Sequence, residues 1–342
     1  MKLALVGLGY WGGKVLRNMV ALLGAENVVA VDQSESLVDW ARVSYPGLIC
    51  RSSLPAALDE PDIDGVVIAT PVASHAPLTS MVLRSGRAVL VEKPLAGEAV
   101  EARELAELAD DLGLVLMVGH TFLFSPRLEL IRRYINDGTL GPIHYATMSR
   151  FALGPYRSDV NVIWDLAPHD FSILSYLLDE FPTSVRTSGR SITRPGSPDV
   201  AFMTLQFASD VVAEVSVSWL APRKVRNTII VGDQRMLVYD DMDADEPIKV
   251  HDKRFVLPEG DSFGAHQLTY RTGDTVAPYV AAQEPLANQL HHFIDCIRGA
   301  ECRSDGWFGA GIVEVLEAAD RSYRRGGATV EVDCRAPARG AA

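Results

Sequence analysis

Short apolar runs separated by amphipathic stretches dominate the first third of the chain. Each run is at most six residues long, rich in β-branched side chains and without polar alternation, as in strands buried on both faces of a parallel sheet. The runs cover residues 3–7, 28–32, 65–70, 88–92 and 114–118. Helices are predicted between them, for example at 12–23 and 99–112. The pattern indicates repeated βαβ units and a doubly wound parallel sheet.

From about residue 121 the apolar runs become longer, and several alternate with polar residues. The predicted strands are 143–151, 200–207, 211–219, 225–231 and 234–239, with a tight hairpin at Gly232-Asp233 and helices at 165–178, 286–297 and 311–324. Alternation indicates a mainly antiparallel sheet with one open face. The chain is therefore predicted to have an α/β domain at 1–120, an α+β domain at 121–334 and a frayed tail at 335–342.

Charge and hydropathy exclude several classes of partner. The 342 residues include 32 Lys and Arg against 44 Asp and Glu, a net charge of −12. Nucleic-acid binding depends on clustered positive charge, so a small-molecule substrate is expected instead. No apolar run is long enough for a membrane span, and no signal-peptide cleavage pattern follows the N-terminus. We expect no membrane partner and a cytoplasmic protein.

The cysteines and histidines give no metal-binding pattern. Cys50, Cys296, Cys302 and Cys334 are scattered, without a CxxC pair or a histidine at ligand spacing, which indicates free thiols. His291 and His292 are adjacent on a predicted helix, so their side chains point in different directions and, even with Asp295 nearby, predict no metal site.

A glycine-rich turn joins the first predicted strand to the first helix. Its residues are Gly7, Leu8, Gly9, Tyr10, Trp11 and Gly12. In this context the turn is expected to hold a dinucleotide pyrophosphate at the helix N-terminus. Asp32, at the end of the second strand, would bind the ribose hydroxyls, and no Lys or Arg follows within three residues to hold a 2′-phosphate. NAD is therefore expected as cofactor, with NADP possible; alternatively, Asp32 is a helix N-cap.

Glu92-Lys93-Pro94 follows a buried strand, on the side where α/β sheets bind ligands. The proline suggests a fixed turn that aims the Lys93 side chain, and the peptide bond before Pro94 can be cis in such a turn. On spacing alone Lys93 could equally be a solvated charge.

A candidate acid–base pair begins the helix predicted at 165–178. Asp165 and His169 are four residues apart, so they can face the same site. A histidine can take a hydroxyl proton near neutral pH, and a carboxylate can orient it. The alternative is an N-capping Asp165 with a packed His169. Asp170 is interpreted as a helix-start charge.

Taken together and in order, these motifs resemble the Gfo/Idh/MocA family of sugar and inositol dehydrogenases. The set also includes Ala69-Thr70-Pro71 with His75, and the resemblance continues through Glu284-Pro285-Leu286. It implies a Rossmann domain followed by an open-sheet domain that forms homodimers or homotetramers through that sheet. It further implies Lys93, Asp165 and His169 as catalytic residues. The residues that it implies around the cofactor are Thr70, Pro71, His75, Glu92, Lys93 and Pro94.

The sequence indicates the substrate-binding residues less clearly than the cofactor-binding ones. His120 follows the fifth predicted strand, and Arg157, Asn161 and Trp164 lie beside the proposed catalytic helix, so all four are candidate substrate contacts. A structural histidine is an equal alternative for His120. Several cations could meet a diphosphate, although a solvated edge is the default interpretation: Arg150, Arg157, Arg223, Lys224 and Arg226.

The resemblance implies an NAD(P)-dependent enzyme that interconverts a secondary alcohol and a ketone on a sugar-like ring. A nucleotide-activated sugar or amino sugar is the favoured substrate, with an inositol or free aldose as the alternative. A non-catalytic NAD(P)-binding sensor is the alternative of another class, but it would not need the Lys93, Asp165 and His169 set.

Overall fold

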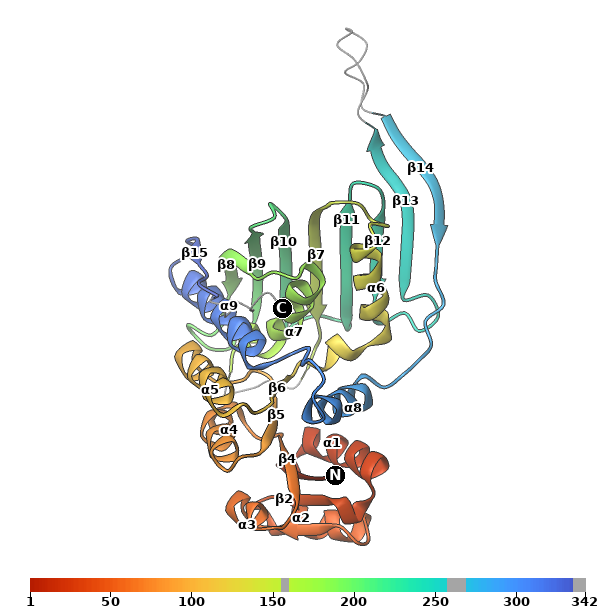
Figure 1. The fold of residues 1–342 in the computed structure, drawn as a ribbon. Coiled ribbons are helices and arrows are strands. Elements are labelled where there is room, and N and C mark those ends of the chain that lie inside the picture. Colours follow the sequence, from red (N-terminus) through yellow and green to blue (C-terminus); the bar gives the residue numbers. More distant parts are fainter. Residues whose placement is uncertain (155–159, 257–268, 335–342) are drawn as a thin grey trace. The chain divides into compact units, whose positions relative to one another are not determined.

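The computed structural model describes residues 1–154, 160–256 and 269–334 (Figure 1). The chain divides into two compact units. The first contains Met1–Ser125 and Gln283–Glu314 with Cys334, and the second contains Pro126–Ala282 and Val315–Asp333. Sequence analysis assigned 283–314 to the second domain, whereas this segment packs in the first unit. The tail expected to fray, 335–342, lies outside the described residues.

The first unit is built on a six-stranded parallel sheet, as predicted. The strand order is β3-β2-β1-β4-β5-β6. The strands are β1 (Lys2–Val6), β2 (Val28–Val31), β3 (Ile49–Arg51), β4 (Ile63–Ile68), β5 (Ala88–Glu92) and β6 (Leu116–Gly119). Leu3, Ala4 and Leu5 of β1 are fully buried, as expected of a central strand covered on both faces. The prediction missed β3, a three-residue edge strand that is only partly buried.

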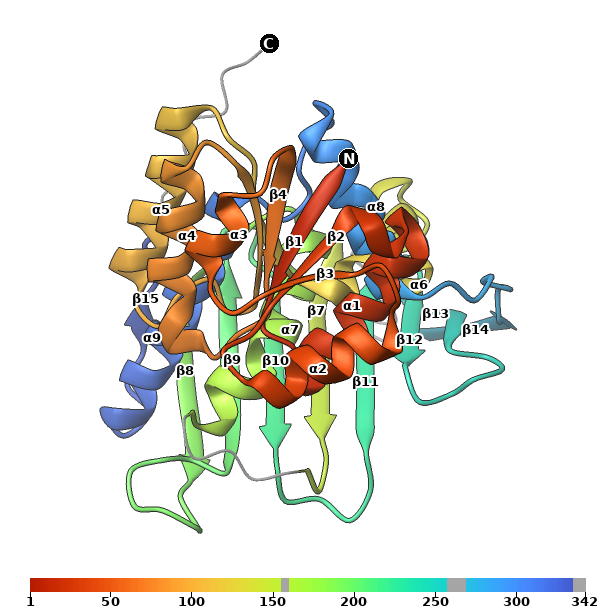
Figure 2. The same cartoon turned by 90° about the horizontal axis from the view of Figure 1, so that it is seen from below.

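Helices cover both faces of this sheet. They are α1 (Tyr10–Leu23), α2 (Glu35–Ser44), α3 (Leu54–Leu58), α4 (His75–Arg84), α5 (Ala99–Leu112) and α8 (Pro285–Ile297), with 3₁₀ turns η1 (Ala25–Asn27), η2 (Val72–Ser74) and η3 (Thr121–Phe124). Figure 2 shows α1 and α8 together on one face and α4 and α5 on the other. The α1–α8 packing explains why α8 belongs to the first unit although it follows the second sheet in sequence.

The second unit contains a nine-stranded sheet of order β14-β13-β12-β11-β7-β10-β9-β8-β15. Its strands are β7 (Ile143–Phe151), β8 (Pro182–Arg190), β9 (Val200–Phe207), β10 (Val212–Ser218), β11 (Val225–Gly232), β12 (Met236–Asp240), β13 (Ile248–Val256), β14 (Thr269–Val276) and β15 (Val330–Glu331). Among the described pairs, β7 and β10 run parallel and the others antiparallel. The mainly antiparallel sheet and the hairpin at Gly232-Asp233 are thus confirmed.

Helices α6 (Pro126–Asn136), α7 (Val162–Leu178) and α9 (Gly306–Arg324) complete the chain. α9 spans the division between the units. In the second unit α7 packs on β7, β9 and β10 (Figure 1). Side chains alternate accordingly: Ala201 and Met203 of β9 are fully buried, whereas Phe202 between them is 45% exposed. No helix in the described ranges is long and apolar enough to cross a membrane.

Candidate functional site

The turn between β1 and α1 requires glycine at two of its three motif positions. Gly7 has a φ of 96°, and a Cβ there would lie 2.5 Å from the carbonyl oxygen of Ala69. A Cβ on Gly12 would lie 1.9 Å from the carbonyl oxygen of Gly7. A Cβ on Gly9, in contrast, would meet nothing within 4 Å. The protein's own packing therefore explains Gly7 and Gly12 but leaves open space at Gly9.

This open space suits a pyrophosphate. Gly9 is the N-cap of α1, and the first turn of that helix contains no acidic residue. The positive end of the helix dipole and its backbone N–H groups attract an anion at this position, and a residue without Cβ lets it approach closely. The residues present thus fit a dinucleotide.

Asp32 lies beside the glycine turn and is held by two backbone amides. One carboxylate oxygen accepts from Leu8 N at 2.7 Å and the other from Ser34 N at 2.8 Å. Ser34, rather than Asp32, is the N-cap of α2, so the N-cap alternative for Asp32 is wrong. Each carboxylate oxygen retains acceptor capacity, which is what ribose hydroxyls require.

Trp11 connects the glycine turn to β5. Its indole N–H donates to Glu92 Oε1 at 2.6 Å, while Tyr10 beside it is 85% exposed. Burial raises the pKa of Glu92 to about 7, against the opposing effects of the Trp11 hydrogen bond and the Lys93 charge. Glu92 is therefore a partly buried carboxyl that changes charge near neutral pH.

The turn after β5 has the expected cis peptide bond between Lys93 and Pro94. Buried His75, at the start of α4, lies between two carbonyl oxygens: its Nδ1 is 2.7 Å from Pro94 O and its Nε2 is 2.8 Å from Thr70 O. Burial lowers the pKa of His75, although both carbonyls favour N–H groups on the ring. His75 thereby joins the loops after β4 and β5. Pro71, next to Thr70, is the N-cap of η2 in the same loop.

His120 follows β6 and is almost fully buried, with 1% exposure. Within the described part of the chain neither Nδ1 nor Nε2 has a hydrogen-bond partner, and the ring packs edge-on against Phe308 at 5.5 Å. Burial, assisted by the charge of Lys93, lowers the pKa of His120 to about 3. The ring is therefore neutral and offers one donor and one acceptor to a ligand.

In the second unit the helix that carries Asp165 and His169 begins earlier than predicted. Asn161 is the N-cap of α7, and its Oδ1 accepts from the backbone N–H groups of Ile163 and Trp164. Its Nδ2 donates to Asp320 at 2.9 Å. The alternative of Asp165 as N-cap is therefore wrong, and Asn161, predicted as a substrate contact, is engaged in capping.

Asp165 is positioned by a residue that sequence analysis missed. The indole N–H of Trp219 donates to Asp165 Oδ2 at 2.9 Å. Trp219 follows β10 and is 4% exposed. Sequence analysis placed Trp219 at the end of the predicted strand 211–219 and gave it no role in the site; the available signal was this position at the end of an alternating strand. Trp164 and His169 on α7 are partly exposed, so both can meet a ligand.

Arg150 and Arg226, predicted as anion-binding cations, pair with carboxylates of the protein. Arg150 donates to both carboxylate oxygens of Asp170, and both side chains are buried. The prediction of Asp170 as a helix-start charge and that of Arg150 as a surface cation are both wrong, because the two neutralise each other inside the unit. Arg226 pairs with Asp241. Arg223 and Lys224 are exposed, and Arg157 lies outside the described residues.

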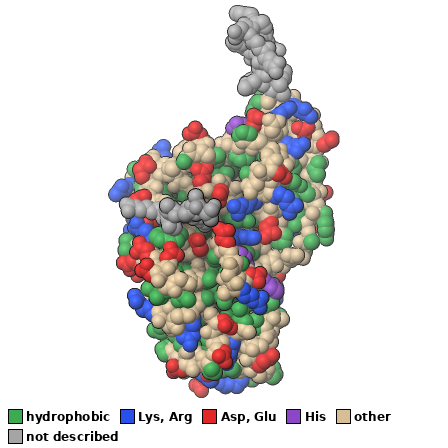
Figure 3. Space-filling view, in the orientation of Figure 1, with side chains coloured by type: hydrophobic (Ala, Val, Ile, Leu, Met, Phe, Trp, Pro, Cys, Tyr) green, Lys and Arg blue, Asp and Glu red, His purple; other side chains and the backbone are tan. Residues whose placement is uncertain are grey.

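The cysteines also differ from expectation. Cys296 and Cys302 lie together with His292, so the prediction that the cysteines have no histidine partner is wrong. The missed signal is the four-residue spacing of His292 and Cys296 on α8. On the face drawn in Figure 3, acidic and basic side chains are mixed.

The predicted site residues thus fall into two groups. The first unit brings together the glycine turn, Asp32, the Glu92–Pro94 turn, His75 and His120 at the carboxyl ends of parallel strands, where such sheets bind ligands. The second unit holds Asp165 and His169 on α7. That Lys93 joins these two in one catalytic set remains a prediction.

Comparison with known proteins agrees with this geometry. Residues 1–120 match the "Oxidoreductase family, NAD-binding Rossmann fold", and residues 128–238 match the "GFO/IDH/MocA C-terminal domain". An inositol 2-dehydrogenase of Rhizobium meliloti is 30% identical over 76% of this chain and 78% of its own. A UDP-N-acetylglucosamine 3-dehydrogenase of Acidithiobacillus ferrooxidans is 27% identical over 70% of this chain and 74% of its own.

The solved structure of the Acidithiobacillus ferrooxidans UDP-N-acetylglucosamine 3-dehydrogenase has the same fold. It superposes with a TM-score of 0.78 and 21% identity, covering 95% of this chain and 98% of its own. Both sheets, the glycine turn and the family matches lead to one conclusion: the chain is an NAD-binding oxidoreductase of the Gfo/Idh/MocA family.

Proposed function

We propose that this oxidoreductase interconverts a secondary alcohol and a ketone on the ring of a nucleotide-activated sugar or amino sugar. The observation that carries the reaction type is the neutral, buried His120 beside the Lys93 turn, whose two ring nitrogens have no hydrogen-bond partner within the described part of the chain. The substrate class is supported by the UDP-N-acetylglucosamine 3-dehydrogenase, a relative in both sequence and structure.

The protein's own side chains transfer the hydroxyl proton and orient the substrate. NAD, when bound, accepts or supplies the hydride. His169 acts as general base or acid on the reacting hydroxyl, because an imidazole has suitable basicity near neutral pH. Lys93 donates a hydrogen bond to the same oxygen and stabilises its developing negative charge. Asp165, held by Trp219, orients His169 or binds a neighbouring hydroxyl.

His120 and Trp164 complete the substrate side of the proposal. Burial keeps His120 uncharged, so it can donate to one sugar oxygen and accept from another without adding a second positive charge next to Lys93. Trp164 offers a partly exposed aromatic surface on α7 for an apolar face of the ring.

An inositol or aldose substrate is the second candidate, because the inositol 2-dehydrogenase is 30% identical. The two are separated by following NADH absorbance with purified protein, NAD⁺ and a panel of UDP-, GDP- and dTDP-sugars, inositols and aldoses. Keto-sugars with NADH test the reverse direction. Turnover confined to one nucleotide sugar, inhibited by the corresponding free nucleotide, is the expected result. Turnover on a free inositol or aldose would refute the nucleotide-sugar proposal.

A further inference from the structure

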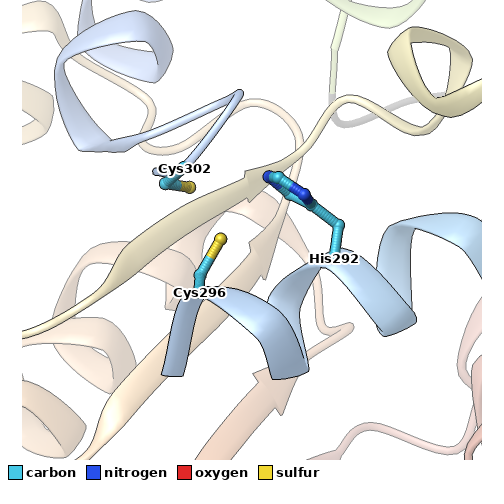
Figure 4. Close-up of side chains that lie close together, drawn as sticks. All are labelled: His292, Cys296 and Cys302. Carbon is cyan, nitrogen blue, oxygen red and sulfur yellow. The ribbon is translucent and has the colours of Figure 1, made fainter. Parts of the chain in front are cut away.

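Three side chains with metal-binding chemistry converge in the first unit, outside the residues proposed for catalysis. His292 and Cys296 are four residues apart on α8 and therefore project from one face of the helix. Cys302 comes from the segment that joins α8 to α9. One donor atom from each lies within 4.8 Å of the other two (Figure 4). Among the residues that the structure describes, the cluster has these three members.

The segment that carries Cys302 is held against β6. Val118 N donates to Ser304 O at 2.7 Å, and Ser304 Oγ donates to Val118 O at 2.8 Å. The position of Cys302 is thus set by the neighbouring backbone pairing, and that of Cys296 by α8. The imidazole of His292 is also supported, because it packs on the Phe124 ring at a centroid distance of 5.2 Å.

Hydrogen bonding shows which protonation state His292 has. The backbone N–H of Arg303 donates to His292 Nε2 at 3.0 Å. An amide N–H can only donate, so Nε2 carries a lone pair. A ring nitrogen that carries a lone pair is the form that ligates metals, and here the Arg303 amide occupies that lone pair.

We propose that His292, Cys296 and Cys302 form a Zn²⁺ site with three protein ligands and a fourth position for water. Two thiolates and an imidazole are a donor set that zinc prefers. Donors about 2.3 Å from a tetrahedral ion lie roughly 3.7 Å apart, so donor atoms that lie within 4.8 Å of one another approach by at most about 1 Å when the ion binds. Coordination through Nε2 releases the Arg303 amide, which can then donate to a metal-bound sulfur.

Such an ion would tie the last turn of α8 to the segment before α9. Both belong to the first unit, and this segment already bonds to β6. A ligand that binds the folded state stabilises it, so Zn²⁺ should raise the thermal unfolding temperature of the full chain. This inference is independent of the proposed substrate, because none of the three residues belongs to the proposed catalytic set.

The test is a titration of the reduced, chelator-treated full chain with Co²⁺, a spectroscopic substitute for Zn²⁺. One equivalent should produce tetrahedral cobalt bands and a thiolate-to-cobalt charge-transfer band, and one equivalent of Zn²⁺ should remove them. Cys302→Ser and His292→Gln should each weaken binding more than about tenfold. Cys296→Ser should behave likewise, with circular dichroism confirming that each variant is folded.

Matched controls are Cys50→Ser and Cys334→Ser, which remove a thiol but no ligand and should retain the spectrum. The proposal is overturned if the wild-type chain gives no charge-transfer band. It is also overturned if Cys302→Ser binds Co²⁺ as tightly as the wild type. A third contrary result is that the reduced protein does not bind Co²⁺ while mild peroxide joins Cys296 to Cys302. That last result would identify a redox-active thiol pair.

Discussion

Lys93 and His169 carry the most direct prediction at the scale of single residues. Positioned proton transfer contributes about 10²–10⁴-fold to a rate, so Lys93→Ala and His169→Ala should each lower kcat by that order. NADH binding, measured by fluorescence, should persist in His169→Ala, because that residue belongs to the second unit. Lys249→Ala, a change of a lysine that pairs with Glu246, serves as control. Near-normal turnover in either variant would remove that residue from the mechanism.

Glu92 gives a prediction about pH and stability. Its pKa rises from 4.5 to about 7 on folding, so between those values the folded protein binds more protons than the unfolded chain. Its contribution to stability is therefore greatest at low pH and is lost as pH rises through about 7, by up to about 3 kcal/mol. Glu92→Gln can still accept from Trp11 but carries no charge.

Thermal unfolding of cofactor-free protein between pH 5 and 8 measures this effect. The unfolding temperature of Glu92→Gln should rise relative to wild type across that range and level off above pH 7. Glu104→Gln replaces an exposed carboxyl of α5, and its unfolding temperature should differ from that of the wild type by the same amount at every pH in this range. A constant difference for Glu92→Gln as well would mean that Glu92 titrates in the usual acidic range.

At the scale of elements, substitutions in the β1–α1 turn distinguish a glycine needed for cofactor binding from a glycine needed for stability. Gly9→Ala adds a methyl that meets no protein atom, so the unfolding temperature should change little while NADH binding weakens about tenfold or more. Gly12→Ala places a methyl 1.9 Å from Gly7 O and should lower stability as well. Differential scanning fluorimetry and NADH titration distinguish the two. Equal NADH affinity in Gly9→Ala and wild type would place the pyrophosphate elsewhere.

An element could be predicted from the sequence when its signal lies within one short segment of the chain. The buried strands and long helices could be predicted because the hydrophobic pattern of each lies within one segment. The Lys93-Pro94 turn could be predicted because its signal is the proline directly after Lys93. The Arg150–Asp170 pair could not be predicted, because the sheet brings together residues from β7 and α7. The capping role of Asn161 was not predicted, because it depends on where α7 begins. Strand β13 was not predicted, because Asp and Lys interrupt its alternation.

At the scale of the whole molecule, the open face of the second sheet predicts self-association. Val212 of β10 pairs with Tyr145 of β7, and Phe202 of β9 points to the same face; they are 39%, 45% and 45% exposed. Burying such side chains against a second copy gains about 25 cal/mol per Å². We therefore expect light scattering to give the mass of a homodimer or homotetramer.

Phe202→Glu tests this face directly. A carboxylate brought against the same face of a second copy would lose its hydration without a partner, so the variant should shift toward monomer as the protein is diluted. Its unfolding temperature as a monomer should change little, because position 202 already faces outward. Val43→Glu, at an 82% exposed position of α2, adds the same charge elsewhere and should leave the mass unchanged. A monomeric wild type would mean that water covers this face, since alternation alone does not distinguish a solvated face from a subunit interface.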